Sequence, residues 1–515
     1  MLHSILHDTH LQSPGLRAFA DRLEAFSSRR YIIWILFGLG IVRNVILLLA
    51  YPPARIADSP LFFLYAEQFA GEVGAPLAGQ IAYPLYPLLI LIAFRWLGSI
   101  YWLIGLQFLM SALIAPLYYA ALKRYSASLA LLAGAVILGD MQVGLMFNFV
   151  STEPLYIFLL ALAFYVFLKQ VESPPGAGDL AAGLLFAALL LTRAVARFLV
   201  APLAVIFWLR TRNWRRTLTL LLGFGVGLIL YALLSSAAVG SVEGLASGDY
   251  MIGSILFNYP EWVKAEHGPN SVRWLELQEQ CPNFYRFLTC AQTELGSWDE
   301  TMRLFSAAAR ETMLNNLVPY IQSTWQKTMD FISLPALVLG VDPELPSEAQ
   351  CASVDELSLL SDKELMQQTR VWLLGIRSEE QMAAFRPRLE AFLRSLCPPL
   401  PHVPQFRSAV DFLSWRYRSL GRPQPYLWYG ALVALVLLLP WARRYTVPVA
   451  ASGVVLVYHA LISAVIANVQ PRYVVVVNPM RAILLCTLIY LVLRLAGYAV
   501  DWALSRRRVS RVAFP

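Results

Sequence analysis

The sequence predicts an all-α polytopic membrane protein, and three properties of the 515-residue chain lead to this prediction. Hydrophobic residues make up 58% of the chain, charged residues only 14%, and the mean hydropathy is +0.56. A soluble domain carries about 25% charged residues, because its surface must stay hydrated. Aromatic residues, at 13%, and the lack of any low-complexity tract also exclude a disordered or fibrous chain.

The net charge of +8 is unevenly divided along the chain. Residues 241–425 hold 16 basic and 22 acidic residues, whereas the remainder holds 25 and 11. An acidic, mostly polar insert therefore interrupts a basic, apolar scaffold. Basic residues beside apolar segments orient a membrane protein in the bilayer, so this excess predicts topology and argues against a nucleic-acid partner.

Ten segments are predicted as membrane spans, since about 20 apolar residues cross roughly 30 Å of hydrocarbon. They are 31–51, 100–122, 126–147, 153–169, 179–193, 194–209, 217–238, 426–441, 446–467 and 479–499. The predicted regions are a cytoplasmic N-terminal segment (1–30), an N-terminal transmembrane module (31–238), an extracytoplasmic cap (239–425), C-terminal transmembrane helices (426–500) and a basic cytoplasmic tail (501–515).

One further apolar run, 83–97, decides the predicted topology. It is short and contains Pro84 and Pro87. If this run crossed the membrane, every later basic cluster would lie outside, against the positive-inside rule. We therefore predict that it stays at the interface as an amphipathic or re-entrant segment of the first outer loop, with Trp96 and Tyr101 as interfacial anchors.

The insert is predicted to be a mainly helical cap, because helix-forming residues dominate 301–316, 354–370 and 377–396. The insert contains four of the five cysteines, Cys281, Cys290, Cys351 and Cys397. An even number outside the cytoplasm is typical of disulfides. Pairing 281 with 290 and 351 with 397 is simplest, although four cysteines permit three connectivities and unpaired buried thiols are the alternative.

Polar residues inside or beside the spans carry the functional signal, because charges there are costly and mark function. Under the predicted topology, the outer face receives Asp58, Asp140, Glu153, Arg193, Arg197 and Arg472, and Arg43 lies in the outer half of the first span. Acids and arginines from distant segments thus converge at one membrane face.

Each of the three acids has a structural alternative to a functional role. Asp58 precedes Ser59-Pro60, and it would suit the N-cap of an interfacial helix. Glu153 follows a Ser-Thr pair at the start of a span, where capping and the helix dipole favour an acid. Asp140 would serve simply to end a span.

Two interpretations fit the arginines on the predicted outer side. Arg193 and Arg472 lie on the outer side, against the preference for basic residues inside. An arginine there either extends to lipid headgroups or holds an anionic ligand, and Arg43 has the same two roles open to it. The sequence has no GxxxxGK[ST], GxGxxG, HExxH or GxSxG motif, and its six histidines do not indicate a metal or triad site.

At these residues the sequence resembles the GT-C superfamily of membrane glycosyltransferases, in particular the branch of protein O-mannosyltransferases and lipid A aminoarabinose transferases. In chain order the matches are Arg43, Asp58, the box Ala82-Tyr83-Pro84-Leu85-Tyr86-Pro87, Ser151-Thr152-Glu153, Leu191-Thr192-Arg193 and Arg472-Tyr473. The resemblance covers about 31–235 and 426–500 and none of the insert. Ala194 stands where the family commonly has proline, and Glu153 where it often has aspartate.

The resemblance implies transfer of a sugar, with inversion, from a polyprenyl-phosphate carrier to an acceptor hydroxyl on a glycan, lipid or protein. It implies Asp58 as general base, an effect typically worth about 10²–10⁴-fold, with Glu153 assisting or orienting the acceptor. Arg43, Arg193 and Arg472 would bind the donor phosphate. The sugar or acceptor pocket would be lined by Tyr83, Tyr86, Tyr473 and Asp140, although interfacial positions explain the tyrosines equally well.

The predicted setting is a multi-pass protein of a bacterial-type inner membrane, surrounded by lipid, with its active site on the extracytoplasmic face. No definite cofactor is implied; a divalent metal stays open as an alternative but is not indicated, because Asp58 has no neighbouring Asp or His. Two other classes remain open: a flippase or transporter of lipid-linked sugars, and a non-catalytic lipid-binding scaffold. A transporter places its polar groups near mid-bilayer in inverted repeats, whereas here they gather at one face, which favours catalysis.

Overall fold

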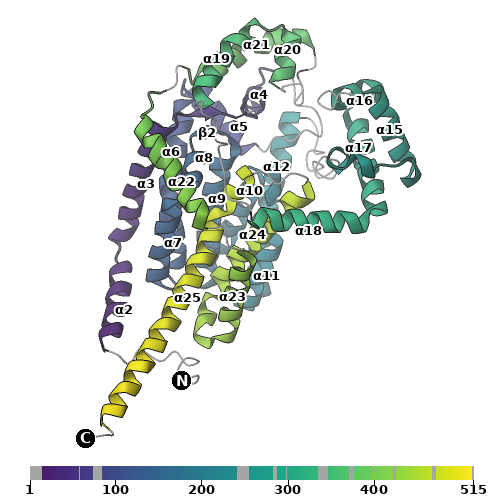
Figure 1. Ribbon diagram of the computed structural model, residues 1–515. Coiled ribbons are helices and arrows are strands. Elements are labelled where there is room, and N and C mark those ends of the chain that lie inside the picture. The colour runs from purple at the N-terminus through teal and green to yellow at the C-terminus, as the bar shows by residue number, and fades with distance from the viewer. Residues whose placement is uncertain are drawn as a thin grey trace.

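The structure is a computed structural model, drawn in Figure 1, and its described residues are predominantly helical. It describes residues 14–56, 58–73, 84–239, 255–281, 287–296, 298–333, 346–369, 376, 378–397, 400–420, 425–466 and 471–512. A helical bundle carries a cap at one end, and α2 (Pro14–Ser27) and the C-terminal half of α25 lie at the other end (Figure 1).

Seven of the described helices are long and apolar enough to cross a membrane, in agreement with a multi-pass all-α membrane protein. They are α3 (Tyr31–Ala50), α6 (Tyr101–Leu122), α9 (Thr152–Val171), η2 with α11 (Ala194–Ala196 and Val200–Thr211), α12 (Trp214–Val239), η8 with α24 (Pro440–Tyr445 and Thr446–Ile466) and α25 (Pro471–Val512). The last helix continues into the segment predicted as a separate tail.

The other three predicted spans fall on shorter apolar helices, α7 (Ala127–Gly139), α10 (Ala177–Leu190) and α23 (Pro425–Leu438). The prediction of one continuous span over 126–147 is wrong. Asp140 has an extended backbone and ends α7, and its side chain accepts hydrogen bonds from Gln142 N and Val143 N to begin α8 (Met141–Met146). An N-cap of this kind starts a new helix in place of a continued one.

The run 83–97 forms α5 (Leu85–Ile90) and a π-helix, η1 (Leu91–Trp96), which together are shorter than a span. They pack against α4 (Ser59–Phe69), the helix predicted after Asp58, and the rings of Phe63 and Phe94 lie edge to face at 5.4 Å. The segment therefore packs against the helix of the same loop, and its place at the membrane interface stays a prediction.

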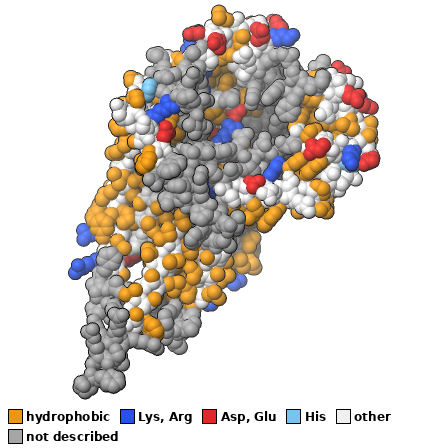
Figure 2. Space-filling model, viewed as in Figure 1, with side chains coloured by type: hydrophobic (Ala, Val, Ile, Leu, Met, Phe, Trp, Pro, Cys, Tyr) orange, Lys and Arg blue, Asp and Glu red, His pale blue; other side chains and the backbone are white. Residues whose placement is uncertain are grey.

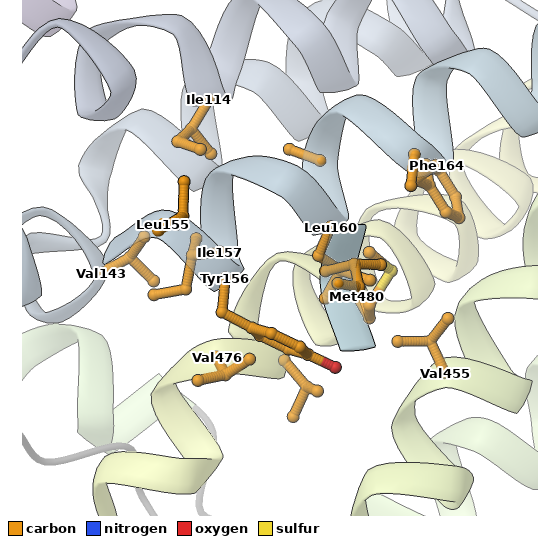
Figure 3. Packing of buried hydrophobic residues seen from close by; sticks show 14 of the residues in the cluster. Ile114, Val143, Leu155, Tyr156, Ile157, Leu160, Phe164, Val455, Val476 and Met480 are labelled. Atoms are coloured by element: carbon orange, nitrogen blue, oxygen red, sulfur yellow. The ribbon is translucent and has the colours of Figure 1, made fainter. Parts of the chain in front are cut away.

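The centre of the bundle is built around α9. Figure 3 shows side chains from this helix, among them Leu155, Tyr156, Ile157, Leu160 and Phe164, packed against residues of α6, α8, α24 and α25. The four neighbours come from both halves of the chain, so the insert between them does not separate the two transmembrane modules. Helix α9 thereby fixes the position of the N-terminal loops relative to the start of α25.

Helices α10 and α12 approach each other through glycine. A Cβ atom at Gly183 would collide with the carbonyl oxygen of Leu220, and one at Gly223 would collide with that of Leu180. Small residues allow this close backbone contact, which in a membrane provides much of the association between helices.

We expect Gly183→Ala to destabilise the fold by about 1–3 kcal/mol, because the added methyl group must push two backbones apart. The matched control is Gly225→Ala on α12, where a Cβ meets nothing within 4 Å and alanine is the better helix former. Thermal unfolding of both variants in detergent measures the difference. Equal midpoints for the two variants would contradict the packing described here.

The cap has two parts. A compact unit contains α15 (Pro269–Gln280), α16 (Phe287–Leu295) and α17 (Trp298–Asn315) around a core of Trp274, Phe287 and Phe305, and Cys281 is bonded to Cys290. It is preceded by α14 (Ile255–Asn258), η4 (Pro260–Trp262) and η5 (Ala265–His267), and α18 (Leu317–Ser333) connects it to the bundle.

The second part of the cap lies over the loop between α3 and α6 and consists of α19 (Pro346–Leu359), α20 (Asp362–Gln368) and α21 (Glu379–Arg394). Cys351 is bonded to Cys397, so the simplest predicted pairing is the one observed. The helix predicted over 354–370 is divided between α19 and α20. Helix α22 (Pro404–Leu420) then returns along α3.

Candidate active site

Two short strands bring the loop between α3 and α6 against the start of α9. Strand β1 (Ala54–Arg55) pairs in parallel with β2 (Phe149–Val150). The Ser59 hydroxyl adds a hydrogen bond to the carbonyl of Val150 at 2.7 Å, and from α6 the Gln107 amide donates to the carbonyls of Phe147 (2.8 Å) and Phe149 (3.0 Å). Asp58 and Glu153, which follow the two strands, are therefore fixed on the same side of the bundle.

Asp58 stands at the N-cap position of α4 but does not cap it with its side chain. Instead its carboxylate accepts a hydrogen bond from the Arg472 guanidinium at 3.1 Å. The two side chains are 28% and 30% exposed. The carboxylate therefore faces a partly open space and has no bond to the helix that would hold it there.

Glu153 and Arg193 form a second acid–arginine pair, with a nitrogen–oxygen distance of 2.6 Å. Glu153 lies in the first turn of α9, and Arg193 has an extended backbone in the turn between α10 and η2. Their side chains are 3% and 17% exposed, so this pair is more deeply buried than the first. Glu153 therefore occupies the predicted position at the start of a helix and also forms an ion pair with Arg193.

Tyr473 joins the two pairs. The guanidinium carbon of Arg193 lies 5.1 Å from the centre of its ring, and that of Arg472 lies 5.2 Å away. Cations held over an aromatic ring gain electrostatic attraction from the ring's quadrupole. We call Asp58, Glu153, Arg193, Arg472 and Tyr473 the charged cluster. Both of its cations thus lie against the same aromatic ring.

Arg43 and Asp140 take part in a different network. The Arg43 guanidinium is buried and donates to Asn44 Oδ1 (3.0 Å) and Ser111 Oγ (2.7 Å). The second oxygen of Asp140 accepts a hydrogen bond from Asn478 Nδ2 at 2.8 Å. Asn478 lies six residues after Arg472 on α25, or about 9 Å along the helix, so this network lies deeper in the bundle than the charged cluster.

The predicted pocket tyrosines differ in position. Tyr473 belongs to the charged cluster, whereas Tyr86 is fully buried and donates its hydroxyl hydrogen to Gln107 at 3.0 Å. Tyr86 thereby supports the same amide that holds strand β2. Tyr83 lies outside the described residues.

A polar contact that no sequence pattern indicated lies one helical turn after Glu153 on α9. The Tyr156 hydroxyl lies 2.8 Å from His459 Nε2, and His459 Nδ1 lies 2.7 Å from the carbonyl of Val455. A carbonyl only accepts, so Nδ1 carries the proton and Nε2 accepts from the tyrosine in a neutral ring. His459 is thus a satisfied core residue.

A cavity of about 420 Å³ opens between the loop that joins α3 to α6 and the cap. The loop lines it with three residues that flank Asp58, and the cap adds polar and apolar residues from α19, α20 and α21. Its walls include Arg55, Ile56, Pro60, Glu356, Gln368 and Thr369. The cavity is large enough for a sugar-sized group.

Helix α21 is tied to the loop below by charge and by aromatic packing. Arg388 bonds Glu67 at 3.0 Å and Glu72 at 2.6 Å, and Arg95 also contacts both acids. Hydrogen bonds from Arg95 and Arg388 lower the pKa of Glu72 below its usual value. The Phe63 ring stacks on Phe392 at 4.4 Å. These contacts hold α21, which forms part of the cavity wall, in place over α4.

Comparison with family models and with curated proteins finds no match to this chain. Among the described residues, no group of three or more His, Cys, Asp or Glu lies close enough together to hold a metal ion.

Proposed function

We propose that this chain is an integral-membrane glycosyltransferase of the GT-C type. It would move a sugar from a polyprenyl-phosphate carrier to an acceptor hydroxyl on the extracytoplasmic face. The observation that supports the proposal is the charged cluster. Two acid–arginine pairs, drawn from four segments that are far apart in the sequence, meet around one tyrosine at the cap end of the bundle.

The two arginines would bind the phosphate of the donor. A polyprenyl phosphate is a stable leaving group once its charge is neutralised, so the reaction needs cations at this position and no general acid. Preorganised charges count most in a site that is shielded from water, and both Arg193 and Glu153 are largely buried. Arg472 would exchange its bond to Asp58 for one to the phosphate.

Asp58 would then act as general base. The acceptor oxygen forms a bond to the anomeric carbon, the bond from that carbon to the phosphate oxygen breaks, and the electron pair leaves with the phosphate. The acceptor proton passes to the carboxylate of Asp58. Attack opposite to the leaving group inverts the anomeric carbon. Glu153, paired with Arg193, would hold that cation in place.

The cavity under the cap is the proposed acceptor side, because Ile56 and Pro60 in its wall stand on either side of Asp58 in the sequence. A hydroxyl group presented from this cavity would arrive beside the base. The acceptor would be a glycan, a lipid or a protein that enters beneath α21. Arg43 and Asp140 would act indirectly, by fixing the helices that carry the charged cluster, and no cofactor is part of the proposal.

We expect Arg472→Ala to weaken the binding of polyprenyl monophosphate by roughly 10- to 100-fold, since a hydrogen bond to a charged group is worth about 1.5–3 kcal/mol. The uncharged polyprenol, which lacks the phosphate, should bind wild type and variant equally. Arg197→Ala is the matched control, from the same outer face. If Arg472→Ala binds the phosphate as tightly as wild type, the donor site is misplaced.

The orientation of the chain has its own test. A cysteine at Asn213, in the turn between α11 and α12, should resist an impermeant maleimide in intact cells, because that turn is proposed to be cytoplasmic. A cysteine at Ala265 in the cap should react. The reverse pattern would place the charged cluster on the cytoplasmic side and would refute the proposed orientation.

A further inference from the structure

Helix α18 lies crosswise to the spans. Figure 1 shows it running from the compact unit of the cap across the side of the bundle, and it packs against α24 and α23. At its end the Arg481 guanidinium donates to the carbonyls of Ile332 (3.0 Å) and Phe331. Arg481 lies nine residues after Arg472, which is about 14 Å along α25. The end of α18 therefore rests beside the spans and not above them.

The side chains of α18 divide into three faces. Thr328 and Phe331 are buried against the bundle. Val318, Ile321 and Trp325 are apolar but 63%, 58% and 65% exposed. At about 100° per residue these three fall within an arc of roughly 60°.

The third face of α18 is polar. Gln322, Gln326 and Asp330 are exposed and centred roughly 100° around the helix from the apolar face. One face of α18 thus packs on the protein, while an apolar face and a polar face are both exposed. We expect such a helix to contact an apolar medium on one side and an aqueous medium on the other.

The apolar face continues the lipid-facing surface of the neighbouring spans. Leu437 and Leu438 on α23 are 63% and 71% exposed, and Val457 and Leu461 on α24 are also exposed. In Figure 2 hydrophobic side chains cover the side of the bundle and continue onto the underside of the protruding lobe, whereas most of the acidic side chains lie above. In a membrane, lipid acyl chains surround exposed apolar residues of the spans. The apolar face of α18 is continuous with those residues, so it would contact the same acyl chains.

We propose that α18 is an in-plane helix embedded in the leaflet on the cap side of the membrane. Val318, Ile321 and Trp325 contact lipid acyl chains, and the two glutamines face headgroups and water. Helices of this kind bury their apolar face about 5–10 Å into the boundary, and tryptophan is enriched there. The helix anchors the compact unit at a fixed height, and this inference is independent of the proposed function.

Nitroxide labels on single cysteines in nanodiscs of phosphatidylethanolamine and phosphatidylglycerol test this placement. The labelled variants are Val318→Cys and Ile321→Cys, with Gln322→Cys and Gln326→Cys as matched controls on the polar face. All four positions are exposed, so a label replaces no packed side chain. The native Cys486 is buried, and Cys281, Cys290, Cys351 and Cys397 are in disulfides.

Labels at 318 and 321 should collide more often with oxygen than with a water-soluble nickel chelate, and labels at 322 and 326 should show the opposite ratio. Preference for the nickel chelate at all four positions would overturn the proposal. So would shielding of 318 and 321 from both reagents, since a second copy or another protein would then cover the face.

A measurement without labels checks the same claim. Brominated acyl chains should quench Trp325, and the difference between wild type and Trp325→Phe isolates its fluorescence from that of the other tryptophans. A difference signal that brominated lipid leaves unchanged would also reject the membrane placement.

Discussion

Asp58→Asn is expected to lower the rate of sugar transfer by at least about 10²-fold and to leave donor binding intact. Asparagine keeps an oxygen that accepts the hydrogen bond from Arg472, so the cluster keeps its shape. What the variant loses is the ability to take a proton from the acceptor hydroxyl. The expected loss is therefore in kcat and not in the affinity for the donor.

The measurement compares turnover of a defined polyprenyl-phosphate sugar with binding of polyprenyl monophosphate. Asp411→Asn is the control, because Asp411 is an exposed acid of α22 that accepts a hydrogen bond from Tyr51, close to the same loop. Wild-type turnover in Asp58→Asn would remove Asp58 from the role of base. A non-catalytic scaffold would also show no effect of this variant on glycosylation in cells.

Arg193→Ala is expected to destabilise the protein by about 3–5 kcal/mol in addition to weakening donor binding. The change leaves Glu153, whose side chain is 3% exposed, without its ion-pair partner. Removing one partner of a buried pair leaves an uncompensated charge, and that accounts for most of the cost. The double variant Arg193→Ala/Glu153→Ala removes both charges, so we expect it to recover part of the lost stability.

Thermal unfolding in detergent separates these effects, with donor binding measured on each variant that folds. The double variant should unfold above the single variant yet bind polyprenyl monophosphate no better. If Arg193→Ala unfolds at the wild-type temperature, the pair does not hold the start of α9. If the double variant binds donor normally, Arg193 has no part in phosphate binding.

The fold was predictable where hydropathy alone determines it. Every predicted span falls on helical residues, although 126–147 is divided between two helices, and the helix after Asp58 was foreseen. Asp140 was considered as the end of a span, yet 126–147 was predicted as one span, and only the bonds to Gln142 and Val143 reveal that a second helix begins there. Strands β1 and β2 have two residues each, which is too short for any periodic pattern.

Part of the candidate site was predictable in membership, but its pairing was not. Of the predicted residues, the charged cluster contains Asp58, Glu153, Arg193, Arg472 and Tyr473, whereas Arg43, Asp140 and Tyr86 lie outside it. Charge counting placed Asp58, Arg193 and Arg472 at one face, yet it could not say which acid meets which arginine across more than 400 residues. Arg43 illustrates the limit of the method: it was predicted to bind the donor phosphate, but its guanidinium bonds Asn44 and Ser111 through packing between α3 and α6.

A lipid-linked sugar flippase would also need cations beside a phosphate, so binding measurements alone do not distinguish it from a transferase. The two differ in what happens to the bond between sugar and phosphate. A transferase breaks that bond and releases polyprenyl phosphate, whereas a flippase moves the intact lipid across the bilayer.

Mass spectrometry of the lipids of cells that lack this gene is the most direct test of the proposed function. A polyprenyl-phosphate sugar should accumulate in their membranes. Added wild-type protein should convert it to polyprenyl phosphate, with the sugar recovered on an acceptor. An unchanged lipid profile, or an accumulated lipid that wild-type protein leaves intact, would contradict the assignment of this chain as a glycosyltransferase.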